Sequence, residues 1–374
     1  MKIGLLTHHR VINIGSILQA YCVKEFYKSL GHEVILIDLR NWKTEFYEYR
    51  KLFSLKKLRI NLYQYNKLKN IRNFLKKNFE LTKPIFSGNI KKFNKFLINH
   101  KFDLISVGSD TVWELRKKSY TKHSVNEFFL PNYPKKKISF SASMDPIDED
   151  FLNLPKIKKI LDARMKSLKD FNFINVRDFQ TLNIIKSYEL DAKITSDPTI
   201  LMMRSSIFKN FKGIVKNFIG LQLDSISTKD IINKYKDKKN TIDLNGYSTN
   251  EIQKQFISNL SIKEYLKLLQ SLNLLITNRF HGTLLTLLVS NCSIPIIGYE
   301  DPKKWKSGKS KLREIFSELN LKEFITNDIE KVIYIKKKID EKNLIWQSES
   351  IEKKLIILSN ASKELLKKQL ECLN

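Results

Sequence analysis

Apolar runs of about four residues alternate with amphipathic segments along most of the chain, and this pattern predicts parallel strands connected by helices. The N-terminal part shows the repeating unit: an apolar run at 3–6, a helix-spaced apolar pattern at 16–30 and a second apolar run at 34–37. Gly31 stands where a helix commonly ends in a left-handed residue. Strands that are apolar at every position fit a parallel sheet covered on both faces.

The alternation continues in two groups of segments, so we expect a doubly wound α/β fold. The first group has further strands at 104–107, 138–141, 173–176 and 192–194, with helices near 151–169 and 178–187. The second group has strands at 218–221, 241–244, 274–276 and 294–297, with helices near 261–272, 282–291 and 310–319.

This order predicts two domains, a number that also fits the length of 374 residues. The first domain covers 1–205 and carries a basic, helical insertion at about 43–100. The second domain covers 206–346, and the polar, basic stretch 203–217 is the expected hinge. A last helix within 347–374 is expected to cross back onto the first domain.

The composition predicts a folded protein of a reducing compartment. Cys22, Cys292 and Cys372 are widely spaced and lack CxxC spacing, which indicates reduced thiols without a disulfide framework or a zinc site. The N-terminal apolar run is shorter than the core of a signal peptide. The longest later one, 284–299, is interrupted and falls short of a bilayer span. We therefore expect a cytoplasmic location, at most peripheral at the inner face of the membrane.

The formal net charge of +28 raises the question of a nucleic-acid partner. The excess is mostly lysine, scattered along a chain without a zinc finger, an RNA-binding aromatic signature or a basic heptad helix, so no nucleic-acid partner is expected. Within 43–100, however, basic residues are mixed with aromatic ones. Such a segment is either a solvated helical surface or a contact for an anionic membrane or an acidic glycan.

Polar residues follow several of the expected strands, at the edge where open α/β sheets bind ligands. After the first strand, Asn13 and Ser16 can cap the following helix, and Gly15 allows a ligand to approach the backbone. Capping alone is the alternative interpretation of this group.

A second polar group follows the expected strand at 104–107. Asp110, next to Ser109, is a candidate for binding sugar hydroxyls or for acting as a general base. Trp113 is a candidate for stacking on a sugar. The alternative is a helix cap followed by a core tryptophan.

Two further cations come after strands. Arg177 is either a cation that faces the ligand edge or half of a surface pair with Asp178, which would contribute little energy. Lys303 follows the strand at 294–297, and only its position singles it out in so lysine-rich a chain.

The most distinctive segment is the strand-to-helix turn after 274–276, which carries Arg279, His281 and Gly282. Free N–H groups at a helix start attract anions. A guanidinium beside an imidazole suits a phosphate or carboxylate ligand combined with proton transfer. An ordinary strand–loop–helix junction with one satisfied histidine is the alternative.

Taken in order along the chain, these motifs resemble those of the polysaccharide pyruvyl transferase family. The resemblance rests on these blocks: Asn13-x-Gly15-Ser16-x-Leu18-Gln19-Ala20, Phe102-Asp103-x4-Gly108-Ser109-Asp110-x2-Trp113, Lys137-Ile138-Ser139 leading to Ser141-Ala142-Ser143, Val176-Arg177-Asp178, and Arg279-Phe280-His281-Gly282. The chain departs from the family pattern at Ile14 and at Met144-Asp145-Pro146, where a tyrosine and an aromatic–glycine pair are more usual.

The resemblance implies a GT-B-like fold, in which two Rossmann-like domains face a cleft. It also implies transfer of a pyruvyl group from phosphoenolpyruvate to a sugar of a surface polysaccharide or its precursor, giving a pyruvate ketal. The acceptor, a glycan or lipid-linked glycan, belongs with the first domain and the donor with the second. His281 matches the active-site histidine, and Arg177, Arg279 and Lys303 fall on or near positions that hold the donor. The remaining substrate-binding candidates are Asn13, Gly15, Ser16, Ser109 and Trp113.

The chemistry of this reaction suits the residues. Phosphoenolpyruvate carries a phosphate and a carboxylate, and arginine can hold either group through paired hydrogen bonds. Ketal formation needs a proton on the donor methylene, so we expect His281 to act as the general acid. Asp110 is expected to orient or deprotonate the acceptor hydroxyl. This scheme requires no metal and no cofactor.

Two other functions stay open on the residues alone. A GT-B glycosyltransferase would use a nucleotide sugar on the same fold, and a basic cleft would also suit its diphosphate. A non-enzymatic protein would bind a membrane or nucleic acid through 43–100.

Overall fold

The computed structural model describes residues 1–50, 52–54, 59–115, 126–144, 147, 149–209, 218–223, 230–231, 240–245, 256–300, 302 and 310–373. Backbone contacts divide the chain into two units. Unit 1 comprises Met1–Phe53, Asn73–Met202 and Leu358–Asn374, and unit 2 comprises Ser54–Arg72 and Met203–Ile357. Each unit contains a parallel sheet joined by helices, so the predicted α/β class is confirmed.

These units differ in two places from the predicted domains. The segment Ser54–Arg72 was expected inside the first domain, but it groups with unit 2. The last helix, which was expected to cross back onto the first domain, is divided between the units: its residues up to Ile357 group with unit 2 and those from Leu358 group with unit 1. Most of the predicted hinge, 210–217, lies outside the described residues.

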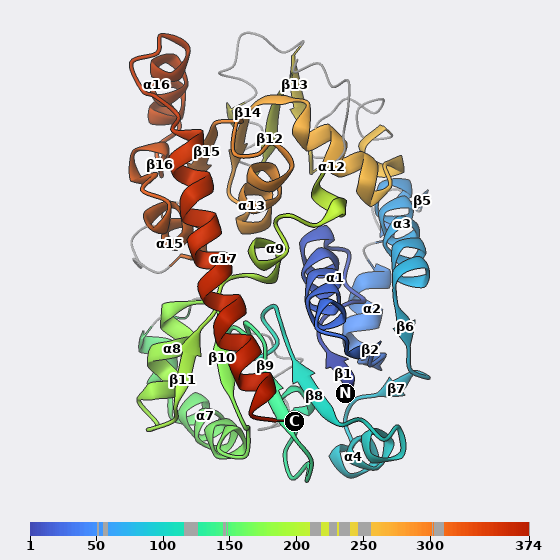
Figure 1. The fold of residues 1–374 in the computed structure, drawn as a ribbon. Coiled ribbons are helices and arrows are strands. Elements are labelled where there is room, and N and C mark those ends of the chain that lie inside the picture. Colours follow the sequence, from blue (N-terminus) through green and yellow to red (C-terminus); the bar gives the residue numbers. More distant parts are fainter. Residues whose placement is uncertain are drawn as a thin grey trace. The chain divides into compact units, whose positions relative to one another are not determined.

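Unit 1 is built on a parallel sheet whose strands follow the apolar runs of the sequence (Figure 1). Neighbouring strands pair in the order β6-β2-β1-β8-β9, and each pair is parallel. A parallel pair, β10 and β11, adjoins β9 through a bridge between Ile138 and Phe173. The strands are β1 (Lys2–Leu6), β2 (Glu33–Leu36), β6 (Glu80–Leu81), β8 (Leu104–Val107), β9 (Lys137–Ser139), β10 (Ile174–Val176) and β11 (Ala192–Ile194).

The helices of unit 1 begin at identifiable signals. Asn13 caps the first helix, Asp178 caps α8, and Pro155 occupies the first turn of α7, where its missing N–H costs nothing. The first helix packs on the sheet, where the Tyr27 hydroxyl hydrogen-bonds Ser106 of β8 at 2.8 Å. These elements are α1 (Ile14–Ser29), the 3-10 turn Glu127–Phe129, α6 (Glu149–Leu152), α7 (Pro155–Leu168), α8 (Phe179–Lys186) and α9 (Pro198–Leu201).

The basic insertion is helical, as predicted, but it also contains short strands that the sequence did not reveal. The short strand β3 (Leu39–Arg40) comes just before it. Besides β6, its members are α2 (Trp42–Arg50), β4 (Phe53–Ser54), β5 (Arg59–Ile60), α3 (Leu62–Asn78), β7 (Ile85–Phe86) and α4 (Ile90–Asn99). The N-terminal part of α3 belongs to unit 2, where Asn66 Nδ2 donates to Asn259 Oδ1 at 2.6 Å. Nearby, Asn70 Nδ2 donates to the Leu260 carbonyl at 2.9 Å.

Unit 2 has a second parallel sheet, in the order β13-β12-β14-β15-β16. Its strands are β12 (Phe218–Gln222), β13 (Thr241–Asp243), β14 (Leu272–Thr277), β15 (Ile296–Tyr299) and β16 (Ile325–Thr326). Its helices and turns are Ser206–Phe208, α12 (Ile262–Gln270), α13 (Phe280–Val289), α15 (Lys311–Glu318), Lys322–Phe324 and α16 (Ile329–Asp340). A capping box starts α12: Ser261 Oγ accepts from the Glu264 N–H, and the Glu264 carboxylate accepts from the Ser261 N–H.

The C-terminal helix α17 (Ser348–Glu371) buries a stripe that includes small polar residues. In unit 1 the Ser359 hydroxyl donates to the Leu201 carbonyl at 3.2 Å, and the Ser196 N–H donates to Ser362 Oγ at 2.9 Å. Further along, Asn175 of β10 and Gln369 exchange amide hydrogen bonds of 2.7 and 3.1 Å. The serines therefore let the helix lie close to the strand ends of β10 and β11.

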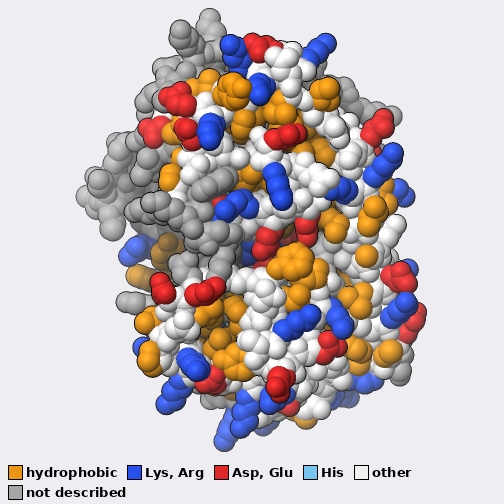
Figure 2. All heavy atoms as spheres, turned by 90° about the vertical axis from the view of Figure 1, so that its left-hand side faces the viewer, with side chains coloured by type: hydrophobic (Ala, Val, Ile, Leu, Met, Phe, Trp, Pro, Cys, Tyr) orange, Lys and Arg blue, Asp and Glu red, His pale blue; other side chains and the backbone are white. Residues whose placement is uncertain are grey.

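Charged side chains on the face drawn in Figure 2 are mixed rather than segregated. Lys and Arg side chains lie among Asp and Glu side chains and apolar groups, without one continuous basic patch. This distribution agrees with the interpretation of the net charge as a compositional bias. Over the described residues, no helix combines the length and the apolar character that a membrane crossing requires.

Candidate functional site

Asp110 lies at the carboxyl end of β8, where the backbone turns sharply. Gly108 has a φ of +107° and Asp110 a φ of +82°, both in the left-handed region that favours glycine. No side chain fits at Gly108, because its Cβ would lie 2.5 Å from the carbonyl oxygen of Phe140. After this turn Asp110 reaches α1, where its Oδ2 accepts a hydrogen bond of 2.5 Å from Ser16 Oγ.

Arg177 connects Asp110 to a second carboxylate. Its Nη1 donates to Asp197 Oδ2 and to Gln19 Oε1, both at 2.9 Å, and its Nη2 lies 3.5 Å from Asp110 Oδ1. Ser109 Oγ donates to the same Gln19 oxygen at 2.6 Å. The Arg177 side chain is only 3% exposed. Burial lowers the pKa of Arg177, but Asp197 and then Asp110 more than offset this, so the pKa rises above its usual value.

This network places the guanidinium of Arg177 between two carboxylates, Asp197 and Asp110. Asp178, its alternative partner in the sequence, caps α8 by accepting the Thr181 N–H at 2.8 Å. Arg177 therefore connects Asp110 to Asp197, and its expected role in holding the donor stays a prediction.

The expected N-terminal ligand residues, Asn13, Gly15 and Ser16, have different roles in the structure. Asn13 Oδ1 accepts the Gly15 N–H at 3.0 Å, so Asn13 is the helix cap, and buried Gly15 supplies the capped group. Ser16 is not a cap. It lies inside the first turn of α1 and uses its hydroxyl on Asp110.

Trp113 belongs to the core and does not form a sugar platform. It is 0% exposed, its ring stacks on Phe129 at 5.6 Å, and its Nε1 donates to the Phe128 carbonyl at 3.2 Å. The expectation that Trp113 stacks on a sugar is wrong, because the chain after Asp110 folds inward and encloses the indole.

In unit 2, the expected turn joins β14 to α13 at the carboxyl edge of the sheet. Arg279 is the residue that precedes the helix, and its side chain is exposed. Its backbone N–H donates to Thr277 Oγ1 at 2.9 Å, which fixes the turn. His281, half-buried in the first turn, has its ring 5.2 Å from that of Phe280 at an interplanar angle of 83°. The turn thus places Arg279 and His281 beside the free N–H groups of a helix start.

Gly282 is needed in this turn because a neighbouring side chain occupies the space of a Cβ. A Cβ on Gly282 would lie 1.8 Å from Gln222 Oε1 and 3.0 Å from Thr277 Oγ1. Gln222 is itself held, since its Nε2 donates to the Tyr265 hydroxyl at 3.0 Å. Burial raises the pKa of Tyr265, and the charge of Arg279 offsets part of that rise. The guanidinium therefore lies close enough to act on this network.

The third expected donor cation, Lys303, lies outside the described residues. Lys67 of α3, which the sequence did not single out, belongs to unit 2 instead. Burial lowers the pKa of Lys67 from 10.5 to about 8, Asp243 raises it in part, and Arg279 lowers it further. A lysine from the N-terminal insertion thus shares an electrostatic environment with the Arg279 turn.

Unit 1 contains a second charged cluster, centred on Asp38, which the sequence also did not reveal. Asp38 follows β2, and it accepts hydrogen bonds from Arg40 Nη2 at 2.8 Å, His9 Nε2 at 3.1 Å and Arg10 Nη1 at 3.2 Å. Burial alone would raise the pKa of Asp38, but the bonds from His9 and Arg40 and the nearby charges hold it well below its usual range. His9 Nδ1 lies 3.0 Å from the Thr7 carbonyl oxygen, so both ring nitrogens of His9 have a partner.

Where the structure describes the chain, no group of three or more His, Cys, Asp and Glu side chains has the arrangement of a metal site.

Several solved structures share the fold of this chain. The UDP-GlcNAc 2-epimerase of Methanocaldococcus jannaschii is 12% identical, with a TM-score of 0.50, and the match covers 96% of this chain and 100% of that chain. The N-terminal domain of Candida albicans trehalose-6-phosphate phosphatase is 10% identical, with a TM-score of 0.50 and coverage of 99% and 96%. At such identities the likeness shows the fold alone: the chain has a GT-B-like fold class with two Rossmann-like units.

The sequence itself carries the finer assignment. Residues 13–299 match the polysaccharide pyruvyl transferase family, a range that includes the Asp110 network and the Arg279–His281 turn. A comparison with curated proteins gave no match. The chain belongs to the polysaccharide pyruvyl transferase family.

Proposed function

We propose that this protein transfers a pyruvyl group from phosphoenolpyruvate to a sugar of a polysaccharide or its precursor, with formation of a pyruvate ketal. Membership of the family supports pyruvyl transfer to a glycan. The observation that carries the donor assignment is the turn before α13, where Arg279 and His281 accompany a helix N-terminus. Each of these groups matches a chemical requirement of phosphoenolpyruvate.

The donor is assigned to the residues of unit 2. Phosphoenolpyruvate is a compact anion, and an exposed arginine can grip its phosphate or carboxylate through two parallel hydrogen bonds. The free N–H groups at the start of α13 add donors and a favourable dipole for the second anionic group. Lys67 supplies a further positive charge to this environment.

His281 begins the reaction as the general acid. It gives a proton to the C3 methylene, which becomes the methyl group, and C2 becomes an oxocarbenium-like centre. An acceptor hydroxyl attacks C2 and loses its proton. The C2–O bond to phosphate then breaks, inorganic phosphate leaves, and a second hydroxyl attacks C2 and loses its proton to close the ketal ring. Atoms balance as phosphoenolpyruvate plus a sugar diol giving a ketal plus phosphate.

Asp110 is the proposed acceptor-side base of unit 1. Its carboxylate is held on one oxygen by Ser16 and on the other by Arg177 and the Thr111 N–H. These bonds hold the carboxylate in one orientation, in which it can orient or deprotonate an acceptor hydroxyl. Asp197 keeps the guanidinium of Arg177 in place.

The test is donor-dependent product release. The full-length protein is incubated with methyl glycosides of galactose, glucose, mannose and N-acetylglucosamine, and with either phosphoenolpyruvate or a UDP-sugar. We expect phosphate release that depends on both glycoside and phosphoenolpyruvate, and a loss of about 10²–10⁴-fold in turnover for His281→Ala. Arg204→Ala, at an exposed arginine of unit 2, is the control and should keep wild-type turnover.

Release of UDP in place of phosphate would identify a nucleotide-sugar glycosyltransferase and refute the donor assignment. Wild-type turnover in a folded His281→Ala protein would remove the general-acid role.

A further inference from the structure

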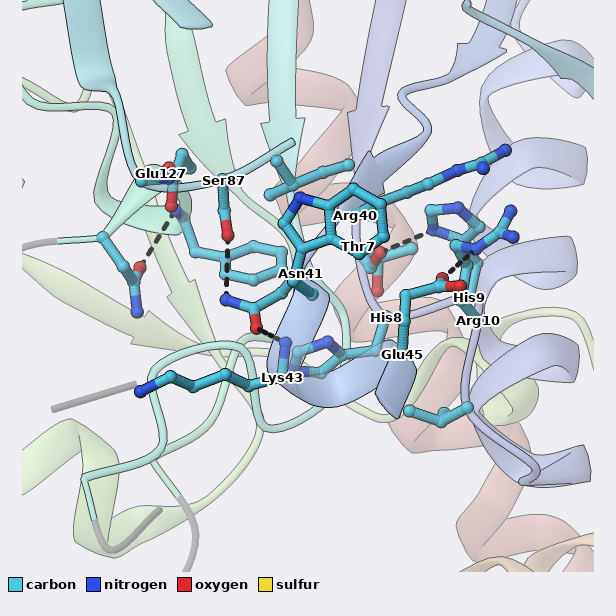
Figure 3. A pocket seen from close by; sticks show the side chains of 16 residues that line it. Thr7, His8, His9, Arg10, Arg40, Asn41, Lys43, Glu45, Ser87 and Glu127 are labelled. Atoms are coloured by element: carbon cyan, nitrogen blue, oxygen red, sulfur yellow. Dashed lines mark hydrogen bonds and ion pairs between the residues drawn. The ribbon is translucent and has the colours of Figure 1, made fainter. Parts of the chain in front are cut away.

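A cavity opens at the carboxyl edge of the unit 1 sheet, on the β2 side of the Asp110 network (Figure 3). Its walls come from the loop after β1, from β3 with the start of α2, from the loop after β7, and from the 3-10 turn Glu127–Phe129 with its cap. The cavity volume is about 210 Å³. This is below the roughly 300–1,000 Å³ of pockets for drug-sized ligands, so it fits a small ligand on the scale of one sugar ring.

Two arginines in its wall are held by carboxylates. Arg40 and Arg10 both hydrogen-bond Asp38, and Arg10 Nε also donates to Glu45 Oε1 at 2.5 Å. Glu127 accepts the Gly88 N–H at 2.5 Å. These groups are fixed donors and acceptors, which suit a ligand that is rich in hydroxyl groups.

The opposite wall adds neutral polar groups. Asn41 Nδ2 donates to Ser87 Oγ at 2.8 Å, and Asn41 Oδ1 accepts the Lys43 N–H at 3.0 Å. Figure 3 shows Asn41, Ser87 and Glu127 grouped on one side of the cavity, with His9 and Arg10 on the other. Amide and hydroxyl groups held in this way make directional hydrogen bonds with sugar hydroxyls.

Trp42 gives the cavity an apolar platform. Its indole is 69% exposed, although it stacks on Phe86 with ring centroids 4.3 Å apart and an interplanar angle of 11°. The stacking holds the ring in place while leaving most of its surface uncovered. An exposed, immobilised indole beside neutral polar groups is suited to the apolar C–H face of a pyranose, whose slightly positive hydrogens meet the negative face of the ring.

The aromatic surface continues along α2. Phe46 and Tyr49 follow Trp42 at spacings of four and three residues, so they share one helix face, and they are 71% and 40% exposed. A row of exposed aromatic side chains leading away from a one-ring cavity fits a ligand of several linked sugars.

We propose that this cavity binds one sugar residue of the acceptor glycan on Trp42, and that the aromatic row of α2 supports the residues next to it. The name acceptor rests on the proposed function, whereas saccharide binding by the cavity does not depend on it. The cavity adjoins the proposed base, because Thr7, which lines it, donates its hydroxyl to the Ser109 carbonyl at 2.8 Å. Ser109 precedes Asp110 in the chain.

Saturation-transfer NMR on the full-length protein, without phosphoenolpyruvate, tests the proposal directly. The probes are the methyl glycosides of galactose, glucose, mannose and N-acetylglucosamine, with lactose and cellobiose as disaccharides. We expect at least one probe to bind the wild type, and Trp42→Ala to weaken that binding by about tenfold or more, equivalent to about 1.4 kcal/mol. Trp42→Phe should retain most of the affinity. Tyr334→Ala, at an exposed aromatic residue of α16, is the matched control and should bind as the wild type does.

Several outcomes would overturn the assignment. These are the absence of a signal from every probe, unchanged binding in Trp42→Ala, or an equal loss in the Tyr334→Ala control. Trp42-dependent capture of phosphatidylglycerol vesicles without a saccharide signal would make α2 a membrane contact instead. Saccharide binding with no turnover of phosphoenolpyruvate would refute the proposed function and leave the cavity assignment standing. If turnover by Trp42→Ala has the wild-type KM for the glycoside, the cavity assignment is refuted and the proposed function stands.

Discussion

Replacing Arg177 by methionine should destabilise unit 1 more than most single substitutions would. Methionine keeps much of the side-chain volume but removes the charge and the hydrogen bonds. Asp197, which is fully buried, then loses a 2.9 Å charged partner, and Asp110 loses one at 3.5 Å. The change therefore leaves a carboxylate uncompensated in the protein interior.

The size of the effect follows from the cost of such a charge. Removing one partner of a buried ion pair typically costs about 3–5 kcal/mol, against a total domain stability of about 5–15 kcal/mol. Without the guanidinium, burial should raise the pKa of Asp197, so the carboxyl group becomes protonated as the pH falls. The loss in free energy of unfolding of Arg177→Met relative to wild type should therefore be largest at neutral pH and become smaller toward acidic pH.

Urea unfolding followed by circular dichroism at pH 7.5 and 5.5 measures both expectations. The double variant Arg177→Met/Asp197→Asn should recover part of the loss, with a coupling of about 1–3 kcal/mol. Arg177→Lys, which keeps the charge but not the planar fork, should lose less than Arg177→Met. A free energy of unfolding within about 0.5 kcal/mol of wild type for Arg177→Met, the range of neutral surface changes, would refute the buried network.

Two further predictions concern unit 2. Gly282→Ala should destabilise the protein by about 1–3 kcal/mol, because the new Cβ would lie 1.8 Å from Gln222 Oε1. Adding Gln222→Ala should restore most of the lost melting temperature. A double variant that melts no higher than Gly282→Ala would count against that contact. Lys67 has a pKa of about 8 in the folded protein, compared with the usual 10.5. Between these two pH values the unfolded state binds more protons than the folded state, so the free energy of unfolding should rise with pH. Lys67→Met should lack this rise in urea unfolding between pH 7.5 and 10, and parallel curves for the two proteins would contradict the assignment.

The longer strands were predictable because apolar residues predominate in each of them, and polar residues flank them. β8, β10 and β11 match their predicted runs to within a residue at either end. β6 and β16 were missed because each has only two residues, too few to show a period. That Ser54–Arg72 groups with unit 2 could not be predicted either, because the position of an insertion in the sequence does not show which hydrophobic core its helix packs against.

The roles of site residues were harder to predict. In the sequence, a polar residue after a strand gives the same pattern whether it caps a helix, forms an ion pair or binds a ligand. Trp113 was misassigned for this reason: the sequence does not show whether the chain after Asp110 turns inward or outward. Asp197 has a recognisable signal in the sequence, although it was not among the expected site residues. An aspartate before Pro198 is typical of a helix cap, and Asp197 does cap α9, where it also meets Arg177 across 20 residues of chain.

Calorimetric titration of phosphoenolpyruvate into the wild-type protein and Arg279→Ala tests the central claim most directly. The account predicts that the wild type binds phosphoenolpyruvate and that Arg279→Ala binds it about tenfold to a hundredfold more weakly, the loss of one or two charged hydrogen bonds. UDP-sugars titrated in the same way should give no comparable heat. Equal affinity of the two proteins for phosphoenolpyruvate, or tight binding of a UDP-sugar where phosphoenolpyruvate fails to bind, would contradict the account.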